Sequence, residues 1–247
     1  MRITPLLTLA ALACRLTAAE APGLVWSEDF SDPASFGKNW KPYGFLAAGI
    51  SEKSPLGKSV SGKDARPEWW SLSEGVLVGR NMAEEKHPPG IRRDVQGADL
   101  RVTLRFKLLK EGMLGLSFAG PNRAVERDFN VGGIHVRSSG VSAWDNDVMH
   151  PKGSPEAAEL KKKGVWNRKF FYVKTDKTPV AADAWHTLTV EIRGRRLTAA
   201  VDGREAVAFD TVCGDCPKQN IGLQAGGTKK GEPSVPTWVD DVKVERL

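Results

Sequence analysis

The chain has 247 residues, of which 40% are hydrophobic and 27% charged, and its formal net charge at pH 7 is +6. This length suffices for one large β-type domain, or two small ones, with a buried core. The ordinary charged fraction argues against wholesale disorder, and no apolar run reaches the roughly 20 residues that a membrane span needs.

The first segment has the features of a secretory signal peptide. A short basic head precedes an apolar stretch over residues 3–13, and small residues at Thr17, Ala18 and Ala19 follow it. This pattern predicts cleavage after Ala19 and an exported protein, periplasmic or extracellular. Cys14 raises the alternative of a lipoprotein anchor, which the preceding Ala-Leu-Ala fits less well.

Cleavage after Ala19 would remove two of the 36 basic and none of the 30 acidic side chains. The remaining excess is small and dispersed, so nucleic acid is not an expected partner.

Short strands separated by turns are predicted along the rest of the chain. The clearest covers residues 99–109, where apolar side chains occupy every second position and polar ones fill the other face. Asp202-Gly203 predicts a tight hairpin turn. The other expected strands are residues 24–30, 69–72, 75–79, 113–118, 134–137, 168–174, 186–193, 197–201, 205–209, 221–225 and 238–244.

These elements favour an all-β sandwich of two sheets, forming a single domain over residues 20–247. One short helix is expected at residues 154–164, because Ser154 suits the N-cap and Pro155 the first turn. The stretches 37–68, 119–133 and 144–167 contain few alternating positions and are expected to be long loops, which tend to be functional. Consecutive strand residues point to opposite faces, so one of Trp69 and Trp70 is expected in the core and the other outside.

Cys213 and Cys216 have a Cys-Gly-Asp-Cys spacing. The spacing alone suits a redox pair or half of a zinc site, but no second cysteine pair accompanies it. In an exported protein it predicts a small disulfide loop.

The densest cluster of polar and aromatic residues lies between positions 126 and 174. Strand alternation puts His135 and Arg137 on one face and Ile134 and Val136 on the other. If the apolar pair faces the core, the polar pair faces solvent or a ligand. Two interpretations follow: an ordinary solvent-facing surface with a stacked tryptophan, or a carbohydrate site. The side chains that would bind sugar hydroxyls or rings are Glu126, Trp144, Asp145, Asp147, Trp166 and Lys174.

A metal site at the ends of the domain is a further hypothesis. Glu28-Asp29 lies in the first expected strand and Asp240-Asp241 in the last, and terminal strands of a sandwich often lie side by side. Their carboxylates could then hold a structural Ca²⁺. Ordinary edge charges explain the same residues, and we favour that interpretation. No other cofactor is expected.

Several segments follow one another in a characteristic order: residues 26–30, 70–78, 99–108, 185–194, 200–203, 221–224 and 239–242. This order resembles that of the concanavalin A-like jelly rolls, and most closely the 3-keto-disaccharide hydrolase domain. The resemblance implies a two-sheet jelly roll whose concave face carries His135 and Arg137, where family members often have an acidic residue. Related laminarinase-type glucanases carry Glu-x-Asp-x-x-Glu on a central strand. This chain has no such motif, which argues against a retaining carboxylate-pair glycosidase.

The resemblance implies cleavage of 3-keto-glycosides. A ketone at C3 acidifies the C2 proton, so one base can start elimination of the C1 group. His135, or His150 in its place, would be the base, and Arg137 or Lys174 would stabilise the enolate. Asp145 and Asp147 would orient hydroxyls. The alternative is a non-catalytic carbohydrate-binding module or a cell-surface protein.

Overall fold

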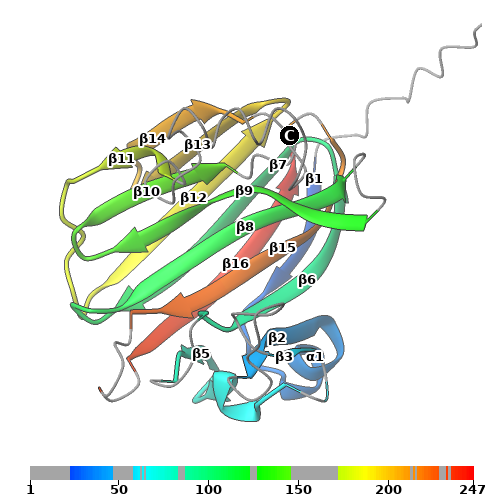
Figure 1. Ribbon diagram of the computed structural model, residues 1–247, viewed down its shortest axis with the longest axis vertical. Helices are drawn as coiled ribbons and strands as arrows, with labels where there is room; N and C mark the ends of the chain where they lie inside the picture. The colour runs from blue at the N-terminus through cyan, green and yellow to red at the C-terminus, as the bar shows by residue number, and fades with distance from the viewer. Residues whose placement is uncertain are drawn as a thin grey trace, which may run out of the picture.

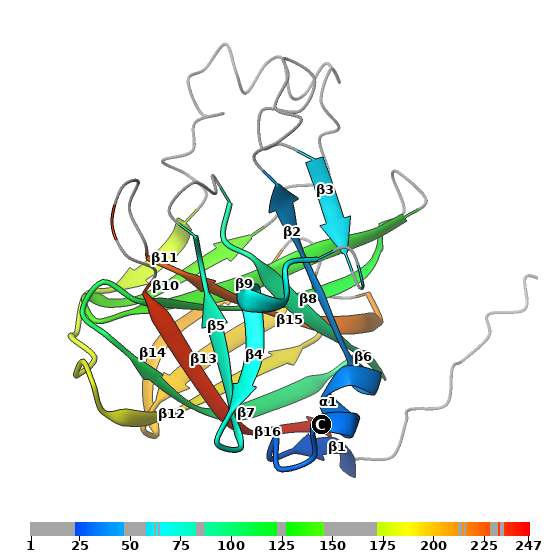
Figure 2. The ribbon, with the colours of Figure 1, turned by 90° about the horizontal axis from the view of Figure 1, so that it is seen from below.

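The computed structural model describes residues 23–46, 58–61, 63, 65–82, 87–122, 127–145, 172–211, 214, 216–227, 232 and 235–247. These residues form two antiparallel sheets that face each other (Figures 1 and 2). The predicted all-β, two-sheet sandwich is therefore confirmed. No helix in the described ranges is long and apolar enough to cross a membrane.

Sheet A has the order β14-β13-β12-β7-β16-β5-β4, and β1 pairs with β16. Its strands are β1 (Gly23–Glu28), β4 (Trp70–Ser73), β5 (Val76–Arg80), β7 (Leu100–Leu108), β12 (Trp185–Arg193), β13 (Arg196–Val201), β14 (Arg204–Asp210) and β16 (Pro236–Arg246). The first and last described strands therefore lie side by side, as the sequence suggested.

Sheet B has the order β11-β10-β9-β8-β15-β6-β2-β3. Its strands are β2 (Trp40–Leu46), β3 (Lys58–Ser61), β6 (Gly90–Gly97), β8 (Met113–Asn122), β9 (Arg127–Arg137), β10 (Gly140–Asp145), β11 (Tyr172–Asp176) and β15 (Lys218–Gly226). In Figure 1, β10, β9, β8, β15 and β6 follow one another across this layer, and Figure 2 shows β2 and β3 rising from its edge.

The core lies between the two sheets and is built from the alternate apolar positions of their strands. In β7, the five apolar positions predicted from the sequence, beginning at Leu100 and ending at Leu108, are all buried. Sheet B contributes the apolar positions of β8, β9 and β15, such as Leu116, Ile134 and Leu223. Because alternation puts these side chains inward, the residues between them form the outer face of sheet B.

The turn between β13 and β14 is confirmed, with φ of 51° at Asp202 and 78° at Gly203. Successive positive φ values are those of the tight turn that matches the twist of a hairpin. The Asp202 carboxylate also accepts hydrogen bonds from the backbone N–H of Thr187 (2.8 Å) and from Nδ1 of His186 (2.6 Å), which attaches the turn to β12.

Several stretches expected to be loops contain strands. β2 and β3 lie within residues 37–68, and the described parts of 119–133 continue β8 and β9. β6 was not predicted, because its sequence Gly-Ile-Arg-Arg-Asp-Val-Gln-Gly interrupts the apolar alternation. The expectation for Trp69 and Trp70 was also wrong. Both indoles are buried, because Trp69 ends a 3₁₀ turn (Pro67–Trp69) and strand alternation does not apply to it.

The α-helix of the described chain is α1 (Pro33–Asn39), which was not predicted. Asp32 caps it by accepting a hydrogen bond from the backbone N–H of Ala34 (2.9 Å), and Pro33 occupies the first turn. The predicted helix at 154–164 and Cys213 lie outside the described residues. The disulfide of Cys213 with Cys216 therefore stays a prediction, and Cys216 itself is buried.

Candidate functional site

Cross-strand pairing aligns polar and small side chains in two neighbouring rows on the outer face of sheet B. Side chains directly opposite each other on paired strands share a face, so the strand register defines these rows. The first row is Thr175, Ser142, His135, Gly115, Gln224, Gly90 and Tyr43. The second row is Trp144, Gly133, Ser117, Gly222, Arg92 and Lys41.

Glycines in these rows let larger side chains lie flat on the sheet. A Cβ atom added at Gly90 would lie 2.2 Å from Cζ of Tyr43, so the phenol ring covers this glycine. At Gly133 it would lie 2.8 Å from Cζ2 of Trp144. The missing Cβ atoms thus bring functional groups from distant strands toward the centre of the face.

The side-chain amide of Gln224 connects the two ends of the first row. It is hydrogen-bonded to the Tyr43 hydroxyl and to the His135 imidazole. A Cβ atom at Gly115 would meet both Gln224 and His135 at about 3.1 Å, which places these two side chains on either side of that glycine. The Tyr43, Gln224 and His135 side chains therefore form one hydrogen-bonded group, which we name the YQH row.

Both titratable members of the YQH row are neutral at pH 7. Burial, supported by the positive charge of Arg137, lowers the pKa of His135 to about 4. Burial raises the pKa of Tyr43, although the charge of Arg92 and the bond to Gln224 act in the opposite direction. The imidazole can therefore accept a proton, and the phenol keeps one to donate.

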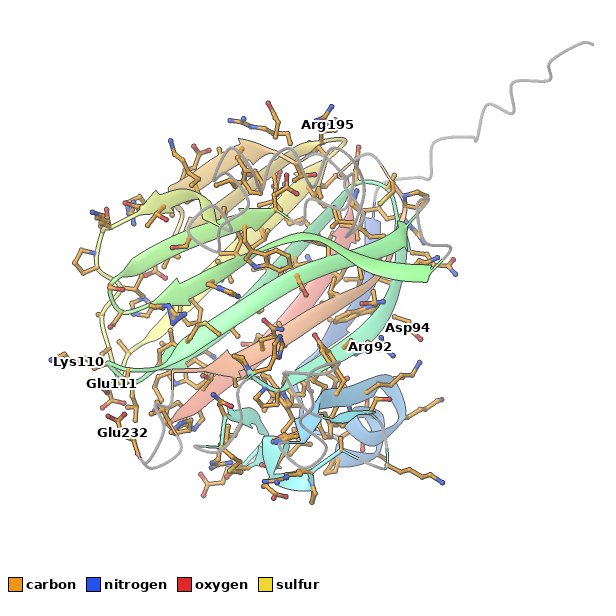
Figure 3. The ribbon with its side chains drawn as sticks, viewed as in Figure 1. Arg92, Asp94, Lys110, Glu111, Arg195 and Glu232 are labelled. Atoms are coloured by element: carbon orange, nitrogen blue, oxygen red, sulfur yellow. The ribbon has the colours of Figure 1, made fainter. Side chains whose placement is uncertain are left out.

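Guanidinium groups lie on both sides of the YQH row. Arg92 is next to Tyr43, with its Cζ 5.8 Å from the centre of the ring. Arg137 lies two residues beyond His135 on β9 and lowers its pKa. Lys41, at the end of the second row, forms an ion pair with Asp94 (2.7 Å). Figure 3 shows Arg92 and Asp94 close together on β6.

The structure brings together three of the residues predicted from the sequence. His135, Arg137 and Trp144 share the outer face of sheet B, and the rings of His135 and Trp144 are 6.1 Å apart, centre to centre. Trp144 is only 4% exposed, however. It supports His135 from the side and presents little surface on which a sugar ring could stack.

Two predicted site residues are placed elsewhere. Lys174 pairs with Ala143, a core residue, so it lies on the face of the sheet opposite to His135. Asp145 follows Trp144 along β10 and, by alternation, also points to the opposite face. Neither residue reaches the YQH row, so the enolate-stabilising role of Lys174 and the hydroxyl-orienting role of Asp145 lose their geometric basis. Glu126, Asp147, His150 and Trp166 lie outside the described residues.

Sequence reasoning missed Tyr43, Arg92 and Gln224. Tyr43 and Arg92 belong to strands that were not predicted, and Gln224 was recognised only as part of a structural motif. One signal was available for Gln224. In residues 221–225 it is the single large polar side chain between apolar neighbours and a glycine, which predicts an outward-facing group.

The neutral His135 predicts that the protein loses stability between about pH 6.5 and pH 4. In this window the His135 imidazole is protonated in the unfolded chain, where its pKa is near 6.5. In the folded chain it stays neutral, because its pKa there is about 4. The stabilisation is complete above pH 6.5, and about 3 kcal/mol is lost as the pH falls through the window. Urea unfolding at about pH 7.5 and about pH 4.5 measures this loss. The loss should be smaller in His135→Gln; an identical loss in both proteins would contradict the assignment.

A cleft of about 400 Å³ lies away from the YQH row, where β1 and β16 pair. It is lined by Ser27, Glu28, Asp29, Asp241, Val242 and Lys243. Burial, together with the charges of Asp241 and Asp29, raises the pKa of Asp240 beside it. Within the described ranges, no three His, Cys, Asp or Glu side chains gather as ligands for a metal ion. The structure therefore adds no support to the Ca²⁺ hypothesis.

No protein-family model matches the sequence, and neither does any curated protein. Solved structures do resemble it. One is a non-specific endo-β-1,3(4)-glucanase from glycoside hydrolase family 16, which is 17% identical to this chain with a TM-score of 0.57. The match covers 94% of this chain and 98% of the glucanase chain. The laminarinase from Rhodothermus marinus is 16% identical with a TM-score of 0.56, covering 92% and 98%. The alginate lyase AlyC3 is 7% identical with a TM-score of 0.63, and the match covers 88% of this chain and 94% of the lyase chain.

At these identities the likeness establishes the fold alone. The chain adopts the concanavalin A-like jelly-roll sandwich that these carbohydrate-active proteins share.

Proposed function

We propose that this protein is exported, binds a carbohydrate on the outer face of sheet B and cleaves 3-keto-glycosides there. The observation that carries the proposal is the YQH row, in which a neutral imidazole and a protonated phenol are joined by one amide. An elimination reaction requires a proton acceptor and a proton donor on the same side of the substrate, and here the two flank one amide on one face of the sheet. Similar jelly-roll structures belong to enzymes that act on glycans, which supports the carbohydrate class.

The proposed reaction begins with proton transfer from C2 of the oxidised sugar to the imidazole of His135. The electrons of the C2–H bond form the enolate of the C3 ketone, which the positive charge of Arg137 stabilises. The enolate then expels the C1 oxygen, giving a C1–C2 double bond, and Tyr43 donates a proton to the departing oxygen. Water then adds across this double bond: its OH goes to C1 and its remaining proton restores Tyr43. The His135 imidazolium, whose low pKa favours rapid exchange of its proton with solvent, protonates C2 and so completes a net hydrolysis.

The low pKa of His135 favours this substrate over an ordinary glycoside. An imidazole with a pKa of about 4 is a weak base. It can remove a proton only where a neighbouring group has already made that proton acidic, as a C3 ketone does for C2–H. Retaining hydrolysis of an unmodified glycoside instead needs two carboxyl groups about 5 Å apart. The two rows contain none.

The test is incubation of the purified protein with 3-keto-trehalose in deuterated water, with unoxidised trehalose as the matched substrate. We expect release of the unmodified glucose half only from the oxidised sugar. Elimination followed by water addition places deuterium at C2 of the 3-keto product, whereas direct hydrolysis does not. A reaction without protein corrects for spontaneous exchange next to the ketone. Cleavage of both sugars at similar rates, or release without deuterium at C2, would exclude the mechanism.

The second candidate is a non-catalytic carbohydrate-binding protein. The weak basicity of His135 is the observation that favours it, because a neutral imidazole is also a good hydrogen-bond partner for sugar hydroxyls. Saccharide binding measured by calorimetry, without turnover of any 3-keto-glycoside, would decide for this candidate.

A further inference from the structure

Two guanidinium groups on the outer face of sheet B lack the carboxylate partners that their neighbours have. Within the described chain, the ion pairs of sheet B include Lys41 with Asp94 and Arg93 with Glu28, but none that involves Arg92 or Arg137. Arg92 lies between the two paired cations, Lys41 across the strand pair and Arg93 next in sequence. Among the described cations next to the YQH row, Arg92 and Arg137 are therefore the two without an ion pair.

The two arginines lie on opposite sides of the YQH row. Arg92 belongs to β6 and Arg137 to β9, with β15 and β8 between them. Their backbones are therefore three strand spacings apart across the sheet, about 14 Å, and four residues apart along the strands, about 13 Å, which gives a separation of roughly 20 Å. Arg92 lies in the row of Ser117 and Gly222, whereas Arg137 lies beyond His135 on the other side. A ligand that contacts the YQH row and extends across the strands would pass between them.

The charged side chains beside the YQH row leave a net positive charge when the ion pair of Lys41 with Asp94 is counted as neutral. Lys41, Arg92 and Arg137 are cationic, and Asp94, the acidic residue two positions beyond Arg92 on β6, is already bound by Lys41. Both arginines are partly buried, which strengthens their interaction with a ligand charge relative to a fully exposed side chain. A guanidinium also binds a carboxylate or sulfate through two parallel hydrogen bonds.

We propose that this site prefers a negatively charged saccharide, and that Arg92 and Arg137 bind its carboxylate or sulfate groups; a neutral glycoside such as 3-keto-trehalose is cleaved there but binds more weakly. The proposal rests on the proposed function, because it concerns the same site and narrows its substrate class. Lys41 and Arg93 each form an ion pair with a carboxylate of the protein. An acidic sugar would supply the corresponding negative charges to Arg92 and Arg137.

The experiment compares saccharides that differ only in charge. Calorimetry measures binding of a β-1,4-linked mannuronate oligomer, the matching β-1,4-linked mannose oligomer and a sulfated form of the latter, in low salt and in about 0.5 M NaCl. We expect at least one acidic oligomer to bind roughly tenfold or more tightly than the neutral one, and the difference to shrink in high salt. The carboxylated and sulfated arms show which anion is preferred.

Variants then assign the effect to the two arginines. Arg92→Gln and Arg137→Gln should each weaken binding of the acidic oligomer by roughly tenfold, a larger factor than for the neutral one. Arg195→Gln is the matched control, because Arg195 is exposed, donates its Nε–H to the carbonyl of Thr211 and lies in the turn between β12 and β13 of sheet A, well apart from Arg92 (Figure 3). Thermal unfolding shows whether each variant is folded, and Arg92→Lys, which keeps the charge, should retain part of the affinity.

Equal affinity for acidic and neutral oligomers, unaffected by either arginine variant, would overturn the inference while cleavage of 3-keto-glycosides still supported the proposed function. Failure to bind any saccharide, together with no turnover, would overturn both.

Discussion

Replacing His135 with alanine is expected to abolish turnover of 3-keto-glycosides while the protein stays folded. His135 is the one neutral proton acceptor in the YQH row, and removal of a positioned general base costs roughly 10²- to 10⁴-fold in rate. The side chain lies on the outer face of sheet B, away from the core between the sheets, so its loss leaves the apolar packing intact. Initial rates with 3-keto-trehalose and thermal unfolding of the same preparation measure the two effects.

Three further variants separate chemistry from structure. His135→Gln keeps a hydrogen-bonding group toward Gln224 but cannot take up a proton, so it should be as inactive as the alanine variant. Tyr43→Phe removes the proposed acid and should lower kcat more than it raises KM. His186→Gln is the control, because His186 lies on sheet A and bonds Asp202. Full activity in His135→Gln would remove His135 from the mechanism.

Replacing Arg93 with methionine is expected to destabilise the fold by about 3–5 kcal/mol. Arg93 is bound to the carboxylate of Glu28 (2.8 Å), and the two side chains are only 14% and 5% exposed. Its guanidinium also lies over the ring of Trp26, 4.0 Å from the ring centre. Glu28 accepts a second hydrogen bond from the hydroxyl of Ser35 in α1 (2.9 Å). Arg93 thus joins β6 of sheet B to β1 of sheet A, and its loss would leave a buried carboxylate without its counter-charge.

The matched control is Lys41→Met, which breaks a second ion pair of β6, the one between Asp94 and Lys41 of β2. Lys41 and Asp94 are 52% and 69% exposed, and exposed pairs contribute about 1 kcal/mol or less. The double variant Arg93→Met with Glu28→Gln should recover part of the stability, because it removes the unpaired charge. Urea unfolding of the three variants measures the differences. A loss in Arg93→Met no larger than that in Lys41→Met would show that the buried pair contributes little.

The amino-acid sequence alone determined the class of the fold and the orientation of its clearest strands. The alternation from Leu100 to Leu108 identifies β7 and its buried face, because a pleated strand exposes every second side chain to one side. The same rule places His135 and Arg137 together and away from the core. Asp202-Gly203 fixes a hairpin because the turn needs positive φ. These features depend on neighbours in sequence, so local patterns are enough to predict them.

Only the tertiary structure decided which groups meet His135. Gln224 belongs to a strand 89 positions further along the chain, and Tyr43 to a strand 92 positions before it. They come together through strand order and through glycines that leave room for their side chains. The local pattern also suggested Lys174 as a partner, but the register with β10 turns that side chain to the opposite face. Strand order and register follow from packing two whole sheets against each other, and no short stretch of sequence encodes that free energy.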